Sequence, residues 1–108
     1  MSYFNNKILE LTQETYVIPC STNIGIILDN KEKESDVYIV DSGNTEVDGE
    51  YILEVLDEFF EFSNKKYTVK AIINTHAHAD HCGGNAIIQK NTNCEIWVSK
   101  FEKGSLEN

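Results

Sequence analysis

Short apolar segments separated by polar turns run along most of the chain and predict β-strands. The predicted strands are residues 7–13, 15–18, 23–28, 37–40, 68–74 and 94–98. Pro19 ends the second strand, because proline has no N–H to donate to a central ladder. The charged run 31–34 is expected to be a solvated hairpin tip. Segment 37–40 is apolar on both faces, which favours a buried, central strand.

Residues 46–62 follow a different period, with apolar side chains at helical spacing and acidic ones on the opposite face. The apolar positions are Ile52, Val55, Leu56, Phe59 and Phe60. This pattern predicts an amphipathic helix whose aromatic residues belong to the core. Residues 85–89 resemble the first turns of a second helix.

The predicted order is a meander of strands followed by strands that alternate with helices. This order is typical of an α+β or α/β fold with a mixed sheet and helices packed on one face. With 108 residues the chain forms one domain at most, and we expect residues 1–108 to be a single unit.

Charge and composition narrow the class of function. The net charge is −9 and all nine basic residues are lysine, which argues against nucleic acid as a partner. No apolar run reaches the ~20 residues of a membrane helix, and the N-terminus lacks the apolar region of a signal peptide. Three scattered cysteines indicate no disulfide framework. We therefore expect a soluble cytoplasmic protein.

The strongest chemical signal is a cluster of histidines that follows strand 68–74. His76, His78 and His81 are the only histidines of the chain, and Asp80 lies among them. Imidazole and carboxylate groups are ligands suited to zinc and related metals. Alternate side chains of an extended segment share a face, so His76 and His78 can bind one ion. Asp80 and His81 can then reach a second ion.

Five other residues are notable, and for some of them a structural interpretation competes with a functional one. Asp41, at the end of strand 37–40, is either an ordinary turn residue or a carboxylate that orients a metal-bound histidine. Cys82, beside the cluster, is favoured as a small loop residue over a ligand or a reactive thiol. Cys20 and Cys94 are expected to be buried and inert, and Trp97 to belong to the core.

The motif His76-x-His78-x-Asp80-His81, preceded by an apolar strand and followed by Gly83-Gly84, closely resembles the signature of the metallo-β-lactamase superfamily. The strand end at Asp41 and the helix between the two strands fit the same family. The motif is specific, because four ligand-type residues occur at fixed spacing.

This resemblance implies an αββα sandwich that holds two zinc ions, with iron or manganese as alternatives. It implies that His76 and His78 bind the first metal, that Asp80 and His81 bind the second, and that Asp41 lies beneath the site. Asp80 is also the candidate catalytic residue that accepts a proton from the attacking water. The implied reaction is hydrolysis of an ester, thioester, lactam, lactone or phosphoester.

The resemblance covers only the N-terminal half of the family's domain, so the later ligands of the family would follow residue 108. Two ligands per metal are fewer than the three typical of catalytic zinc. We therefore expect weak metal occupancy and little or no hydrolysis from this chain alone. A homodimer could supply the missing half. Two alternatives are a non-catalytic fold fragment or dimerisation module, and an iron-dependent oxygenase of the same family.

Overall fold

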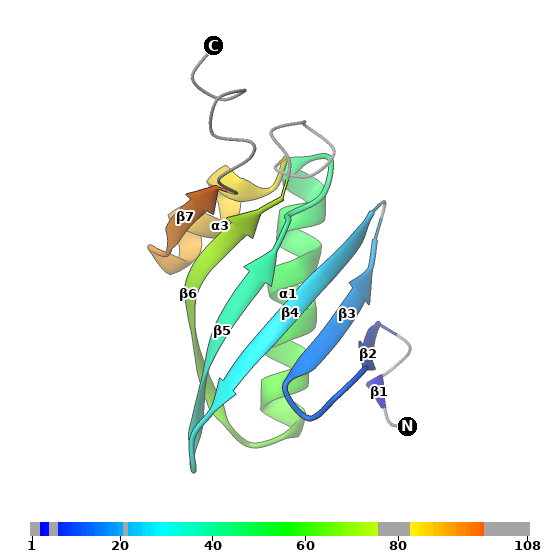
Figure 1. Ribbon diagram of the computed structural model, residues 1–108, viewed down its shortest axis with the longest axis vertical. Coiled ribbons are helices and arrows are strands. Elements are labelled where there is room, and N and C mark those ends of the chain that lie inside the picture. Colours follow the sequence, from blue (N-terminus) through cyan, green and yellow to red (C-terminus); the bar gives the residue numbers. More distant parts are fainter. Residues whose placement is uncertain (1–2, 5–6, 21, 76–82, 99–108) are drawn as a thin grey trace.

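The computed structural model describes residues 3–4, 7–20, 22–75 and 83–98. One seven-stranded sheet runs through these residues in the order in which the strands follow each other along the chain (Figure 1). The strands are β1 (Tyr3–Phe4), β2 (Ile8–Glu10), β3 (Thr15–Pro19), β4 (Asn23–Asn30), β5 (Glu34–Val40), β6 (Lys66–Asn74) and β7 (Glu95–Val98). Strands β1 to β5 form an antiparallel meander, and β5, β6 and β7 are parallel. The predicted mixed sheet is confirmed.

Helix α1 (Glu46–Phe62) connects β5 to β6, and helix α3 (Asn85–Thr92) connects β6 to β7. Both helices lie on the same side of the sheet, as predicted (Figure 1). The Thr45 side chain caps α1 by accepting from the Asp48 N–H, and the Asp48 carboxylate accepts from the Asn44 N–H at 2.8 Å. These bonds satisfy donors that the first turn of a helix leaves unpaired.

The core lies between α1 and the helix-covered face of the sheet. The predicted apolar side of α1 is buried there, and Ile52, Val55, Leu56 and Phe60 are at most 2% exposed. The alternate residues Ile24, Ile26 and Leu28 of β4 face them from the sheet, together with Val37 and Ile39 of β5. Strand β5 is central, between β4 and β6, as its two-sided apolar pattern predicted.

Several predicted boundaries are corrected by turns and pairing that the apolar pattern does not encode. The first predicted strand, 7–13, is shorter, because the N–H groups of Leu11 and Thr12 both donate to Thr15 O and form a turn. Strands β4, β5 and β6 are longer than predicted, because the ladders continue through polar residues such as Asp29 and Asp36. Helix α3 extends three residues beyond the predicted 85–89.

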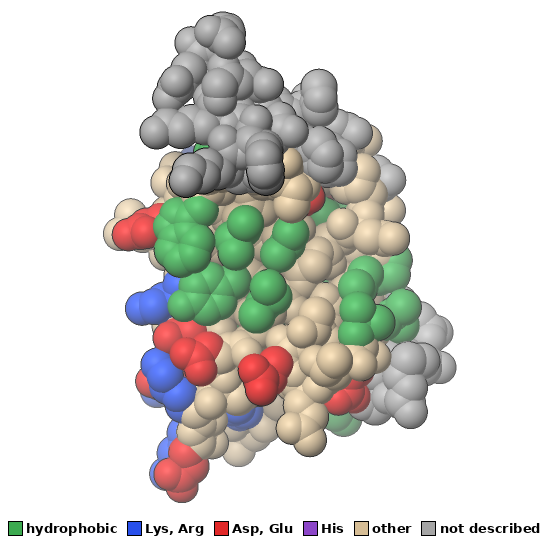
Figure 2. Space-filling model, in the orientation of Figure 1, with side chains coloured by type: hydrophobic (Ala, Val, Ile, Leu, Met, Phe, Trp, Pro, Cys, Tyr) green, Lys and Arg blue, Asp and Glu red, His purple; other side chains and the backbone are tan. Residues whose placement is uncertain are grey.

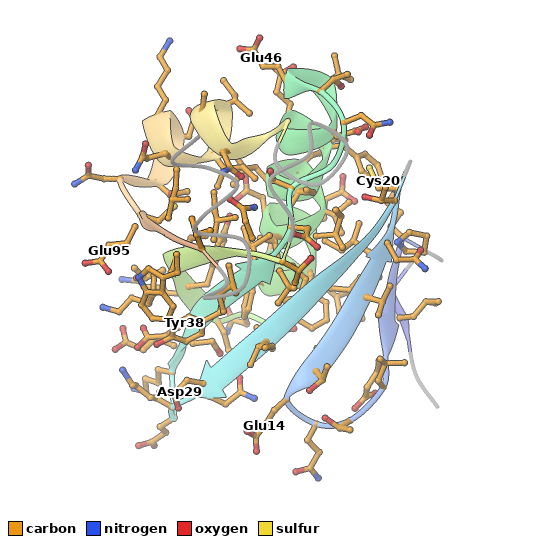
Figure 3. All side chains as sticks on the ribbon, turned by 45° about the horizontal axis from the view of Figure 1, so that its top comes forward. Glu14, Cys20, Asp29, Tyr38, Glu46 and Glu95 are labelled. Atoms are coloured by element: carbon orange, nitrogen blue, oxygen red, sulfur yellow. The ribbon has the colours of Figure 1, made fainter. Side chains whose placement is uncertain are left out.

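Within the described residues, no helix covers the sheet face opposite α1 and α3. We call the apolar part of this face the open face. It consists of Val17, Ile27, Tyr38, Val40, Ile73 and Trp97. The pairing of strands β3 to β7 places one residue of each strand side by side in a row, which is Val17, Gly25, Val40, Ile73 and Trp97. The rings of Tyr38 and Trp97 lie 5.9 Å apart, and Figure 3 shows Tyr38 on the side away from α1.

Trp97 corrects a prediction, because it is 45% exposed on the open face rather than part of the core. The apolar side chains of this face gather toward one end of the strands, and charged side chains lie near the hairpin tip at the other (Figure 2). The charged end includes the cross-strand pair Asp29 and Asp36. An apolar patch with one charged border is typical of a surface that another protein segment covers.

No helix in the described ranges is long and apolar enough to cross a membrane.

Candidate metal site at the strand ends

The segment with the predicted ligands leaves the sheet where two parallel strands end side by side. Strands β5 and β6 are paired up to Val40 and Ile73, so Asp41 and Thr75 follow them at the same edge. The backbone N–H of Asp41 donates to Ile73 O at 2.9 Å, which continues the pairing past the end of β5. Carboxyl ends of parallel strands are where α/β proteins place their sites.

Asp41 binds the residue that directly precedes His76. Its Oδ1 accepts from the Thr75 N–H at 2.9 Å and its Oδ2 accepts from the Thr75 hydroxyl at 2.7 Å. The side chain is buried, with Asp41 only 7% exposed. Its φ of 68° lies in the left-handed region, where aspartate is tolerated better than most residues. Asp41 is therefore both a turn residue and the group that fixes the start of the ligand segment.

Gly83, which directly follows the segment 76–82 with the predicted ligands (the ligand segment), is bonded to the loop after β5. The Gly83 N–H donates to Gly43 O at 2.7 Å. A Cβ atom on Gly83 would come within 3.0 Å of backbone atoms of Asn44 and Thr45, so only glycine fits this approach. The close turn predicted for Gly83-Gly84 is thus explained by contact with the loop after β5.

The predicted ligands His76, His78, Asp80 and His81, and also Cys82, lie outside the described residues. Their assignment stays a prediction, as does contact between Asp41 and a metal-bound histidine. No group of three or more potential ligands occurs within ranges 3–4, 7–20, 22–75 and 83–98. The donor set of the segment fits zinc, and the described residues at both of its ends are bonded to the loop that begins at Asp41.

Thr75 is a residue of the candidate site that the sequence analysis missed. The available signal was its position between a predicted buried strand and the first histidine, where a hydroxyl can bond to a neighbouring strand end. Cys94 is buried, as predicted, whereas Cys20 is only partly buried.

Solved structures with the same fold are metallo-β-lactamases and related enzymes. The chain is similar to MEM-A1, a subclass B3 metallo-β-lactamase from a soil metagenome library, with a TM-score of 0.71 and 18% identity over 93% of this chain and 35% of that one. It is similar to BJP-1 of Bradyrhizobium japonicum, another subclass B3 enzyme, with a TM-score of 0.58 and 22% identity over 83% and 31%.

A third similar structure is the inverting sec-alkylsulfatase Pisa1 from Pseudomonas sp., with a TM-score of 0.58 and 25% identity over 82% of this chain and 14% of that one. The chain thus spans about a third of the length of the two lactamases, and its sheet with two helices matches part of their αββα fold. No curated protein matches the sequence.

The family model for the metallo-beta-lactamase superfamily matches residues 17–108, which include the histidine motif and both strand ends. The chain therefore belongs to the metallo-beta-lactamase superfamily, a family of metal-dependent hydrolases.

Proposed function

We propose that this chain supplies part of the zinc site of a hydrolase. The observation that carries the proposal is that Thr75 and Gly83, which flank the His-x-His-x-Asp-His segment 76–82, are both bonded to the loop that follows β5. His76 and His78 would hold one ion, and Asp80 and His81 a second. Zinc, when bound, lowers the pKa of a coordinated water toward ~7 and polarises the bond to be cleaved.

The residues of this chain have separate tasks in the proposed reaction. Asp41 and Thr75 fix the start of the ligand segment, and Gly43 and Gly83 fix its end. The carboxylate of Asp80 accepts a proton from the attacking water. Iron or manganese could replace zinc with the same ligand set, because imidazole and carboxylate bind all three.

The proposed substrate is a small ester, thioester, lactam, lactone or phosphoester. Similar structures include lactamases and a sulfatase, so the fold does not select one of these. We also propose a cytoplasmic location, which the free thiol of Cys94 supports.

The metal content of the purified chain tests the proposed function. We expect zinc to bind with partial occupancy, because this chain offers two predicted ligands per ion. The double variant His76→Ala, His78→Ala is expected to lose at least half of the bound metal as measured by elemental analysis. Exposed Asn91 lies outside the motif, so Asn91→Ala is the control and should keep it. Equal metal in all three proteins contradicts the assignment.

We propose that a second copy of the chain covers the open face. In an aligned sandwich, a twofold axis parallel to the strands brings the apolar end of one face onto the apolar end of the other. The perpendicular axis would place apolar residues on the charged pair Asp29 and Asp36. The parallel axis also brings the two ligand segments to one edge of the sandwich, where two half-sites could combine.

The size of the open face predicts a weak dimer. Five strands about 4.8 Å apart and two rows of side chains cover roughly 250 Å² per copy, less than the ~800 Å² of a standard interface. We therefore expect a dimer that forms as concentration rises, detected by sedimentation equilibrium. Ile27, 40% exposed, lies within this face, so Ile27→Glu should remain monomeric. Phe62 is the last residue of α1 and is 77% exposed outside the open face, so the control variant Phe62→Glu should still dimerise. A monomeric wild type at every concentration contradicts the proposal.

A further inference from the structure

The amide side chains of buried Asn74 and partly buried Asn85 are bonded to each other across the strand ends. Asn85 Nδ2 donates to Asn74 Oδ1 at 2.6 Å, and Asn74 Nδ2 lies 3.4 Å from Asn85 Oδ1. The Ser42 hydroxyl donates to Asn85 Oδ1 at 2.6 Å and accepts from the Gly84 N–H at 3.1 Å. The network thus joins the last residue of β6, the loop after β5 and the start of α3.

The burial of this network indicates that its geometry is specific. Ser42 is 0% exposed and Asn74 is 3% exposed. Buried polar groups are costly unless each donor and acceptor has a partner, so a fully bonded arrangement fixes the positions of its members. Asn85 is the first residue of α3, and the helix has no side-chain cap bond at Gly84. The Asn85 amide is directed to the strand ends instead of to its own helix.

The two asparagines enclose the ligand motif in sequence. Asn74 precedes His76 by two residues and Asn85 follows His81 by four. Their bond therefore closes a short loop that contains all four predicted ligands. Fixing the two ends of a loop reduces the number of conformations open to the chain between them.

We propose that Asn74 and Asn85, supported by Ser42, are positioning residues that set the metal affinity of the histidine segment. The inference rests on the proposed function, because it requires that the segment binds a metal. The amide pair fixes the chain on both sides of the four predicted ligands, which favours their meeting at one site. Loss of the pair should therefore weaken metal binding and alter the coordination geometry without removing any ligand.

The test is a titration of the metal-free chain with Co²⁺, whose visible absorption reports coordination geometry. Asn85→Ala is expected to bind Co²⁺ about 10-fold more weakly or worse, within the 10–100-fold range of substitutions around metal ligands, and to shift the absorption bands. Asn85→Asp should show an intermediate loss, because its carboxylate can still accept from the Ser42 hydroxyl but cannot donate to Asn74 Oδ1. Asn91→Ala is the matched control on the same helix, since its amide bonds only within α3, to Ile87 O.

Measurements at a temperature where each variant is folded separate positioning from stability. Ser42→Ala removes only the hydroxyl beneath the pair, so it provides a milder test with an intermediate loss if Asn85→Ala does not fold. If folded Asn85→Ala keeps the Co²⁺ affinity and the absorption spectrum of the wild type, this inference alone is overturned. The same result in Ser42→Ala overturns it if Asn85→Ala does not fold. Absence of Co²⁺ binding by the wild type would overturn both the inference and the proposed function.

Discussion

Gly83→Ala is expected to lower the free energy of unfolding by about 3 kcal/mol, at the upper end of typical overpacking costs. The new methyl group would lie within 3.0 Å of backbone atoms of Asn44 and Thr45, and backbone cannot move aside as a flexible side chain can. The Gly83 N–H bond to Gly43 O would be strained by the same displacement. Thermal unfolding followed by circular dichroism should show a melting temperature lower by roughly 12–24 °C for a domain of this size.

Gly25→Ala is the matched control for this prediction. Its Cβ would lie 3.1 Å from Val40 Cβ, a tight contact that needs a shift of only a few tenths of an ångström. Alanine also has a lower entropic cost than glycine within a strand. We expect a change within about 1 kcal/mol. Equal stability of the Gly83→Ala and Gly25→Ala proteins would show that Gly83 is not in close contact with the loop after β5.

Asp41→Ala is expected to cost about 3 kcal/mol or more, because it removes the acceptor of two hydrogen bonds. The Thr75 N–H and hydroxyl would each lose their carboxylate partner in a partly buried place. Alanine is also disfavoured at the φ of 68° that Asp41 adopts. Chemical denaturation gives the free energy of unfolding directly, and metal binding by the folded variant should weaken as well.

Two further substitutions separate the causes at this position. Asp41→Gly accepts the left-handed conformation but lacks the carboxylate, so it should be intermediate. Asp41→Asn keeps an acceptor for the Thr75 N–H and tolerates the same φ, so it should be the mildest of the three. If alanine and asparagine variants are equally stable, the Asp41–Thr75 bonds do not hold the end of β6.

The three residues after β5 connect stability to metal binding. Asp41, Ser42 and Gly43 are consecutive, and each bonds to a residue just before or just after the ligand segment. A substitution in this tripeptide changes the ends of the segment without changing a ligand. Metal affinity and stability should therefore fall together in Asp41 variants, whereas ligand variants such as His78→Ala should lose metal with little loss of stability.

The sequence by itself predicted most of the fold and supplied the candidate ligands. The period of apolar residues distinguishes helix 46–62 from the strands, because each element buries one face at its own spacing. The motif at residues 76–81 is local, so its ligand types and spacing can be read without a structure. Asp41 was found for the same reason, since it directly follows a predicted buried strand.

Only the tertiary structure decided which distant groups meet. Asp41 and Thr75 are 34 residues apart and Ser42 and Asn85 are 43 apart, and register between strands brings them together. The exposure of Trp97 also depends on this level, because an apolar strand pattern does not tell which face of the sheet is covered. Local sequence determines the elements and the donor chemistry, whereas long-range pairing determines what fixes the donor segment in place.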